Sequence, residues 1–441
     1  MRNPLILTLL TLIVGFTVSQ YGGATSREWN FTLIALCLLA LFVWTSGRAI
    51  SSTPAAAPAM PLLTTALLAY VAFQMVPMPS EWLRVLSPAR YEILRGLGPI
   101  VAERWAPLSV SPQLTFAHLL RLLDYLIVFL MAREITFRFA HRIWMPAIPL
   151  LVIGFAEACL GLAQSFGSGV NATGTYVDHA HLAGLLELIL PLSLVLAPIA
   201  HQITKRKTWP AGAKAALVCL PAACAAAILL ALLFTVSRMG LIAAAVSLAI
   251  LGALELISRR DRRRSTALIA VAGGLILLLI SAPLSLISRY EGGLTSEDRI
   301  PIWRSAFTLI AHYPAFGCGL GTFVSGVQRY SSATPGNLVD YAHNDYLQLL
   351  AELGIVGIAP ILALAGLAIS RAFRSLRAES NRTSRLMTMG CMASLAAIAF
   401  HSLVDFQFYI PANMMVAAWI AGIAAGIGVS SPQRVHSSLG K

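Results

Sequence analysis

Charged residues are scarce in this chain of 441 residues. They make up 12% of the sequence, whereas hydrophobic residues make up 57% and the mean hydropathy is +0.76. A soluble domain carries about 25% charged residues, so this composition excludes an ordinary water-soluble protein. Apolar runs such as 217–236 and 267–280 approach the roughly 20 residues that a helix needs to cross a bilayer. We therefore expect an all-α integral membrane protein of many spans.

Cysteine and nucleotide-binding motifs are sparse as well. Of the six cysteines, Cys318 is the one expected outside an apolar segment, so the sequence predicts no disulfide framework. No Gly-Lys-Ser or Gly-Lys-Thr occurs anywhere in the chain, which excludes a phosphate-binding loop of the ATPase type. ATP-driven transport by this chain alone is therefore not expected, and we expect no cofactor.

The apolar segments predict about twelve membrane-spanning helices. They lie at 4–21, 30–47, 60–78, 114–132, 143–164, 181–200, 214–236, 240–257, 266–284, 343–369, 387–406 and 411–429. We interpret the first as a span rather than a cleaved leader, because no small-residue cleavage site stands out. We expect the whole of 1–441 to form a single membrane domain.

Positive charge is in excess, with a formal net charge of +13. Most basic residues, including the clusters Arg259–Arg264 and Arg371–Arg385, fall in the connections on the side of the two termini. Because cytoplasmic loops carry this bias, both termini are expected in the cytoplasm, and the charge does not indicate nucleic-acid binding. All four lysines lie on that side, so the outer side carries only arginines, whose planar fork suits phosphate.

The largest connection, 285–341, lies on the outer side and should be partly helical. Asp298 can cap a helix whose first turn contains Pro301, and Trp303 would then lie at the membrane interface. The glycine-rich stretch Gly317–Phe323 that follows is typical of a tight turn.

The stretch AHNDYLQLLAELGIVG places a histidine at the outer end of a span expected at 342–369. On a helix, Gly354 and Gly357 would lie about 20° and 40° to either side of His343. Small residues allow membrane helices to approach closely, so this face would pack on a neighbour and hold the imidazole in place. The alternative is an interfacial histidine above an ordinary packing seam.

Several arginines are expected on the same outer side. Arg238 lies at the tip of a short hairpin between two apolar segments, where a rigidly held guanidinium could bind an anion. A side chain reaching the lipid headgroups is the alternative. Arg299 and Arg304 lie in the 285–341 loop, shortly before His343.

Three further groups are candidates with simple structural alternatives. The sequence Asp-His-x-His contains His179 and His181, but these would point apart on a helix and no third ligand is evident, so we predict no metal site. His401 and Asp405 share one helical face near the end of the eleventh expected span. Arg121 lies within the fourth span, where pairing with an acidic residue three positions later is the alternative to a functional role.

Taken together, these motifs resemble the O-antigen ligase and O-antigen polymerase family of bacterial membrane glycosyltransferases. The stretch from His343 to Gly357 reads His-Asn, nine residues, Gly, two residues, Gly, which is the hallmark of that family. Other similar features occur in the expected order, at 174–192, 237–240, 298–323 and 401–406.

The resemblance implies a fold, a location and a reaction. The fold would be a GT-C-like bundle of twelve helices with a periplasmic active site, in the bacterial inner membrane. The reaction would transfer a glycan from undecaprenyl pyrophosphate to an acceptor hydroxyl, without a metal and with inversion at the anomeric carbon. In ligases the acceptor is lipid A–core, as part of lipopolysaccharide biosynthesis, and in polymerases it is a second lipid-linked repeat unit.

Matching motifs carry the family's functional residues onto this chain. The resemblance implies that His343 activates or orients the acceptor hydroxyl, a task suited to a base of near-neutral pKa. Arg238 and Arg299 would bind the pyrophosphate, with Arg304 as a further candidate, and Asn344 would orient the start of the helix or a phosphate. More distant candidates are Arg121, His181 and Asp405.

Two alternatives stay open at this point. A polymerase shares every motif with a ligase and differs only in its acceptor. A transporter or flippase for a lipid-linked sugar would use the arginines to guide the pyrophosphate. Alternating-access carriers often show internal repeats, and no convincing repeat is visible here.

Overall fold

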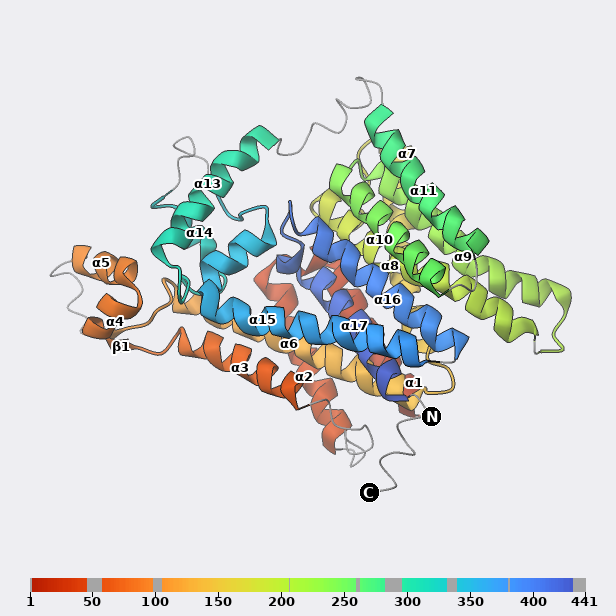
Figure 1. Cartoon of the computed structure of the whole chain (residues 1–441), viewed down its shortest axis with the longest axis horizontal. Helices are drawn as coiled ribbons and strands as arrows, with labels where there is room; N and C mark the ends of the chain where they lie inside the picture. Colours follow the sequence, from red (N-terminus) through yellow and green to blue (C-terminus); the bar gives the residue numbers. More distant parts are fainter. Residues whose placement is uncertain are drawn as a thin grey trace.

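The computed structural model describes residues 2–45, 58–97, 105–205, 207–258, 262–281, 296–330, 339–379 and 381–430. In these residues the chain is almost entirely helical (Figure 1). The larger helices are α1 (Arg2–Ser19), α2 (Ser26–Val43), α3 (Ala59–Phe73), α6 (Pro112–Arg138), α7 (Ile148–Ser168), α8 (His179–Lys205), α9 (Ala211–Phe234), α10 (Arg238–Ile257), α11 (Arg262–Ser281), α13 (Ser296–His312), α15 (Asp345–Ala378), α16 (Arg382–His401) and α17 (Pro411–Ser430).

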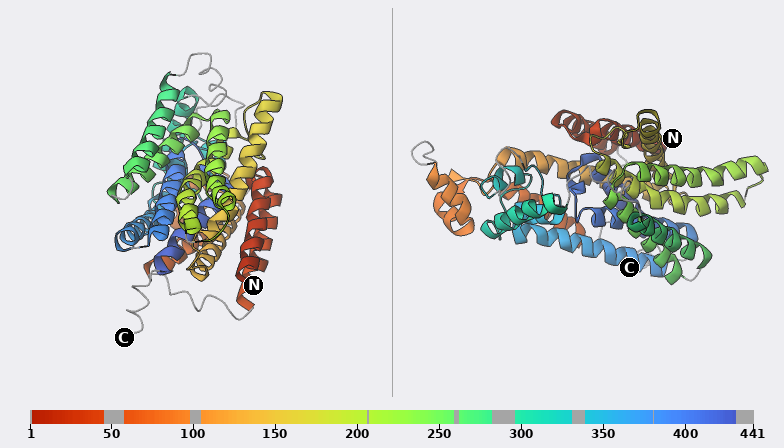
Figure 2. Two further views of the ribbon diagram at one scale, coloured as in Figure 1. Left: turned by 90° about the vertical axis from the view of Figure 1, so that its right-hand side faces the viewer. Right: turned by 90° about the horizontal axis from the view of Figure 1, so that it is seen from above.

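Shorter elements lie between them. They are η1 (Tyr21–Gly23), β1 (Met78–Pro79), α4 (Ser80–Leu86), α5 (Pro88–Gly96), β2 (Trp105–Ala106), η4 (Met145–Ala147), α14 (Phe323–Val327) and η6 (Gln407–Tyr409). The two strands form one antiparallel pair. Figures 1 and 2 show α4, α5, α13 and α14 gathered at one end of the molecule.

A helix lies at each of the twelve predicted spans. Among the described residues, eight helices are long and apolar enough to cross a membrane, namely α2, α6, α7, α8, α9, α10, α15 and α16. Shorter apolar helices lie in α1, α3 and α17, and α11 begins with three arginines. The multi-pass, all-α prediction is therefore confirmed, whereas twelve crossings and a GT-C-like fold stay predictions.

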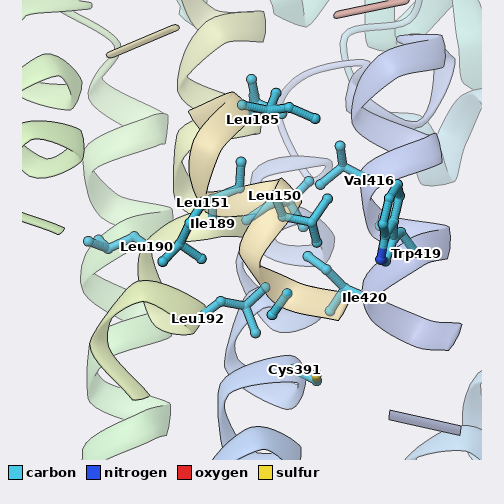
Figure 3. Close-up of a cluster of buried hydrophobic side chains, with 14 of the residues drawn as sticks. Leu150, Leu151, Leu185, Ile189, Leu190, Leu192, Cys391, Val416, Trp419 and Ile420 are labelled. Atoms are coloured by element: carbon cyan, nitrogen blue, oxygen red, sulfur yellow. The ribbon is translucent and has the colours of Figure 1, made fainter. Parts of the chain in front are cut away.

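The core is built around α8, which packs against α9, α10 and α16. Figure 3 shows where this helix meets α7, α16 and α17, with the buried side chains Leu150, Leu151, Leu185, Ile189, Leu190, Leu192, Cys391, Val416, Trp419 and Ile420. Lipid tails are as apolar as leucine, so such contacts stabilise the bundle by close packing rather than by removal from water.

The continuous helical face expected from His343 to Gly357 is wrong. His343 lies before α15, which begins at Asp345 and extends past the expected end of the span at residue 369. Gly354 has φ 62° and ψ −176°, a conformation that is not helical and is essentially confined to glycine. The helix is therefore broken into an outer piece and a longer inner piece.

The break at Gly354 arises because the loop after α13 crosses α15 there. Four backbone hydrogen bonds of 2.9–3.1 Å join the two segments. The N–H groups of Ile355 and Val356 donate to the carbonyls of Pro314 and Ala315, and the N–H groups of Cys318 and Gly319 donate to those of Ala351 and Glu352. These bonds replace the helical ones lost on both sides of the glycine. A broken helix is tolerated in a membrane protein where other protein groups satisfy its backbone in this way.

Gly357 has the role that the sequence predicted, which is close packing. It lies in the inner piece of α15 against the ring of Tyr70 from α3, in a space that a Cβ would fill. The hydroxyl of Tyr70 lies 2.7 Å from the carbonyl oxygens of both Phe316 and Leu353, beside the break. The glycine therefore brings α3 close enough to support the interrupted helix.

The helix predicted in the large loop is present as α13, with a different start. It begins at Ser296, so Asp298 lies inside the helix rather than at the cap, and Pro301 lies beyond the first turn. The extra turn before Pro301 costs a helical hydrogen bond, because proline has no N–H. The indole N–H of Trp303 donates to the Ala342 carbonyl at 3.0 Å, so its polar edge contacts the chain next to His343.

Candidate functional site

His343 lies in a short strap between the large loop and α15. Its φ is +46°, a left-handed backbone conformation that residues other than glycine rarely adopt. The strap is held by the Trp303 bond to the Ala342 carbonyl and by the Ala342 N–H, which donates to Gln348 at 2.9 Å. Backbone strain of this kind often marks a functional position.

Asn344 fixes the direction in which α15 leaves this strap. Its side-chain oxygen accepts hydrogen bonds from the N–H groups of Tyr346 and Leu347, and its amide donates to the Leu403 carbonyl at 2.7 Å. Asp345 strengthens the link, because its carboxylate accepts from the N–H of Phe408 at 2.8 Å. The start of α15 is thus joined to the turn between α16 and η6.

That turn brings Asp405 against the imidazole of His343. The His343 Nδ1 lies 3.5 Å from Asp405 Oδ1, and the other oxygen, Oδ2, lies 3.7 Å from His401 Nε2. Gln407 also donates to Oδ2 at 3.1 Å. Burial by itself would raise the pKa of Asp405, but its interactions with the nearby imidazoles of His343, His401 and His181 outweigh burial and hold that pKa well below its ordinary value.

The sequence placed His401 and Asp405 on one face of a helix, and the structure corrects this. α16 ends at His401, and Asp405 follows in a turn. The two side chains face each other nevertheless.

His181 belongs to the same group of side chains. Its ring meets the edge of Phe406 at a centroid distance of 4.8 Å, and the His343 ring meets Phe406 at 5.0 Å. Tyr341 stacks on the face of Phe406 at 4.1 Å. The Nε2 of His181 is buried without a hydrogen-bond partner among the described residues. The sequence had offered His181 and Asp405 only as distant candidates, and both lie beside His343.

Among the described residues no cluster of three or more His, Cys, Asp or Glu side chains is arranged to hold a metal ion. His179 is oriented toward Asp178, at 4.0 Å, whereas His181 is turned toward Phe406. The two histidines of the Asp-His-x-His motif therefore have separate surroundings.

Arg238 is the first residue of α10, and it lies at the same end of the bundle as His343. The cap is Ser237, whose hydroxyl accepts from the Gly240 N–H at 3.1 Å. Gly240 packs against Ala183 of α8, one helical turn after the start of that helix. Val236, just before the cap, has φ +60°, which is unusual for a β-branched residue. The sharp hairpin thus holds an exposed guanidinium near the beginning of α8.

The two loop arginines lie on different sides of α13. Arg299 precedes Trp303 by four residues, so both project within about 40° of each other, toward the strap that carries His343. Arg304 is exposed and projects about 140° away from Arg299. The Nε of Arg299 is buried and has no hydrogen-bond partner among the described residues. Of the two, Arg299 is the better placed to reach a ligand beside His343.

Arg121 lies inside the bundle on α6. Its guanidinium lies 5.1 Å from the centre of the Trp29 ring and 3.5 Å from the His118 Nε2. The Asp124 oxygens have no hydrogen-bond partner among the described residues, although the charges of Asp124 and Arg121 influence each other. The structure thus places Arg121 among aromatic rings, apart from the direct partners of Asp405.

Glu352 is a site residue that the sequence did not single out. It is fully buried on the outer piece of α15, and the glycine-rich turn wraps around its carboxylate. The N–H groups of Gly321 and Phe323 donate to it at 2.7 and 3.0 Å, and the hydroxyl of Tyr409 donates at 2.5 Å. Gly317, Gly319 and Gly321 all have positive φ, which confirms the predicted turn. An acidic residue inside an apolar run was the available clue.

Glu187 is a second buried carboxylate that the sequence did not single out. It lies in the apolar run of α8 with no exposed surface, and its Oε2 is 3.0 Å from His401 Nδ1. A carboxylate in such a run is a functional candidate by default. Its partner could not be identified from the sequence, because the two residues are 214 positions apart.

Cys318 lies in the same glycine-rich turn and is buried. Burial raises the pKa of its thiol to about 12. All six cysteines are free in the structure. A thiol that keeps its proton is a poor nucleophile, so Cys318 acts as a small packing residue.

Comparison with known proteins bears on one segment of the chain. Residues 223–362 match the family model described as O-antigen ligase. The segment begins in α9 and ends within α15, and it includes Arg238, Arg299 and His343. A search of curated proteins finds no match. Over residues 223–362 the chain is therefore similar to the O-antigen ligase family, and this segment carries the sequence features of that family.

Proposed function

We propose that the chain transfers a glycan from an undecaprenyl-pyrophosphate-linked donor to a hydroxyl of lipid A–core. The reaction would take place on the periplasmic face of the bacterial inner membrane, with both termini in the cytoplasm. The observation that carries the proposal is the pairing of His343 with the buried carboxylate of Asp405, at the end of the bundle that also holds Arg238 and Arg299. The similarity of residues 223–362 to the O-antigen ligase family supports the reaction class.

His343 acts as the general base. Its Nδ1 faces Asp405, which leaves Nε2 to take the proton of the acceptor hydroxyl. The acceptor oxygen attacks the anomeric carbon as the bond from that carbon to the pyrophosphate breaks, and the electron pair departs with undecaprenyl pyrophosphate. This displacement inverts the anomeric centre. The proton stays on His343 as an imidazolium, which the Asp405 carboxylate stabilises.

The arginines act on the leaving group. Pyrophosphate departs as an anion, so it needs little help from an acid. Charge-assisted hydrogen bonds from Arg238 and Arg299 strengthen as that charge develops, which lowers the barrier. Arg304 projects to the other side of α13 and is a weaker candidate. The proposal needs no metal ion, because the guanidinium groups supply the positive charge.

The test is a transfer assay with purified protein in lipid vesicles. It offers the lipid-linked glycan donor with either lipid A–core or a second lipid-linked repeat unit. Product on lipid A–core supports a ligase, whereas product on the repeat unit makes the chain a polymerase with the same chemistry. Activity should persist after full chelation of divalent metals. Movement of the donor across the membrane without any glycan transfer would contradict the proposal and favour a transporter.

A further inference from the structure

His401 occupies an unusual position, between two buried carboxylates. Its Nδ1 lies 3.0 Å from Glu187 Oε2, and its Nε2 lies 3.7 Å from Asp405 Oδ2. The side chains of His401 and Glu187 are 1% and 0% exposed, so water cannot replace either partner. Together with His343, these residues form a row in which carboxylates and imidazoles alternate, here called the acid–histidine row (Glu187, His401, Asp405 and His343).

The geometry indicates which protons this row holds. A neutral imidazole carries a proton on one nitrogen only, and a lone pair on the other would repel a facing carboxylate. Both nitrogens of His401 face carboxylate oxygens, so the arrangement is stable when both carry protons. His401 is then a cation between two anions, and the inner three groups have a net charge of one negative unit. A proton on His343 brings the whole row to neutrality.

We propose that His401, held by Glu187, is a positioning residue that sets how strongly Asp405 attracts a proton onto His343. This inference rests on the proposed function of His343 as the base. His401 neutralises part of the negative charge of Asp405, which weakens the attraction of that carboxylate for a proton on His343. Without that cation, Asp405 would hold His343 in the protonated form, in which it cannot act as a base.

Among the described residues, Asp345 and His181 also lie beside the row. Asp345, from α15, influences both His401 and Asp405. His181, from α8, adds positive charge beside Asp405. Both remain in place when His401 or Glu187 is replaced, so they do not change the direction of the expected effect.

The test compares His401→Gln and Glu187→Gln with the wild-type protein in the vesicle transfer assay between pH 5.5 and 9. Both changes keep the side-chain size similar and remove the cation on residue 401, directly or by removing its counter-charge. The acid limb of the pH–rate profile should move to higher pH by about one unit, so the rate falls about ten-fold at pH 6 and less than about two-fold at pH 9. The double variant should shift the profile in the same direction and should resemble Glu187→Gln, because both then leave Asp405 as the one charge among the inner three groups.

Two controls separate this role from a purely structural one. Ser193→Ala on α8 and Thr388→Ala on α16 remove buried hydroxyls that bond carbonyls of their own helices, and neither should move the profile. Membrane levels and unfolding midpoints of all variants show whether they fold. An equal rate loss at every pH in His401→Gln and Glu187→Gln would overturn the inference while leaving the proposed function intact.

A second test of the inference does not depend on enzymatic activity. NMR of the protein with ¹³C-labelled histidine can follow the titration of His343, whose signal is assigned by its loss in His343→Gln. In His401→Gln, half-protonation of His343 should occur at a pH about one unit higher than in the wild type. An unchanged or lower value would overturn the inference. If the wild type transfers no glycan to either acceptor, the proposed function fails, whatever this titration shows.

Discussion

Asp405 and Glu352 are both buried carboxylates at the same end of the bundle, but their partners differ. Asp405 lies between the imidazoles of His343 and His401. Glu352 accepts hydrogen bonds from two backbone N–H groups and from the hydroxyl of Tyr409. Imidazoles exchange protons near neutral pH, whereas backbone amides do not. Asp405 therefore has neighbours that can exchange protons, whereas the groups that donate to Glu352 keep theirs.

The hydrogen bond from Tyr409 to Glu352 shows why the contacts around Glu352 are stable. Burial and the neighbouring charge of Glu352 raise the pKa of the Tyr409 hydroxyl far above its ordinary value. The hydroxyl therefore keeps its proton at any physiological pH and continues to donate to Glu352. The comparison thus predicts that changes around Asp405 alter activity, and that changes around Glu352 alter stability.

The largest effect is expected for His343→Ala. Loss of a general base lowers the rate of transfer by about 10²- to 10⁴-fold. The unfolding midpoint and the amount of protein in the membrane should stay close to those of the wild type, since the ring is 21% exposed at the edge of the core. His312→Ala, an exposed histidine on α13, is the control and should keep its activity. A destabilised but active His343→Ala protein would reverse the assignment.

Glu352→Ala should have the next largest effect, on stability. It leaves two backbone donors and one hydroxyl buried without an acceptor, at about 1–3 kcal/mol each. The free energy of unfolding should fall by roughly 3 kcal/mol or more, as a lower thermal midpoint in detergent. Tyr409→Phe removes a single donor and should cost about 1 kcal/mol. Glu81→Ala, at an exposed position, should change nothing. Full stability of Glu352→Ala would mean that the cluster does not hold this end together.

Gly354→Ala tests the support that the loop gives to α15. Alanine is strained at φ 62°, ψ −176°, and its Cβ would press against the Ala315 carbonyl. We expect a loss of about 2–3 kcal/mol in the free energy of unfolding. Gly366→Ala lies in the same helix with open space around it and should be neutral or stabilising by up to about 1 kcal/mol. Equal effects at the two glycines would show that the break is unimportant.

The smallest of these effects separates the two loop arginines. Arg299→Ala should lower kcat/KM about 10- to 50-fold, because a charge-assisted contact to the pyrophosphate is lost. Arg304→Ala should change it less than about two-fold, since that side chain projects away from the strap. Arg299→Lys should recover only part of the activity, because lysine lacks the planar fork. A larger effect at Arg304 would mean that the substrate approaches from the other side of α13.

Much of the site was predictable where a property is local. The start of α15 follows from Asn344, whose side chain caps the backbone next to it. The position of Arg238 at the start of α10 was predictable because the hairpin between α9 and α10 is short. One wrong prediction was a continuous helix through Gly354, since nothing near that residue in the sequence shows that the loop after α13 supplies competing carbonyls.

The sequence by itself determined the membrane character and the positions of the helices. In lipid, a backbone segment must satisfy its own hydrogen bonds, so a long apolar run leaves the helix as its only local solution. The tertiary structure alone decided which polar groups meet. Glu187 and His401 are 214 residues apart, and only packing of α8 against α16 brings them together. Burial then gives the pair its influence on Asp405, because charges interact strongly where water is excluded.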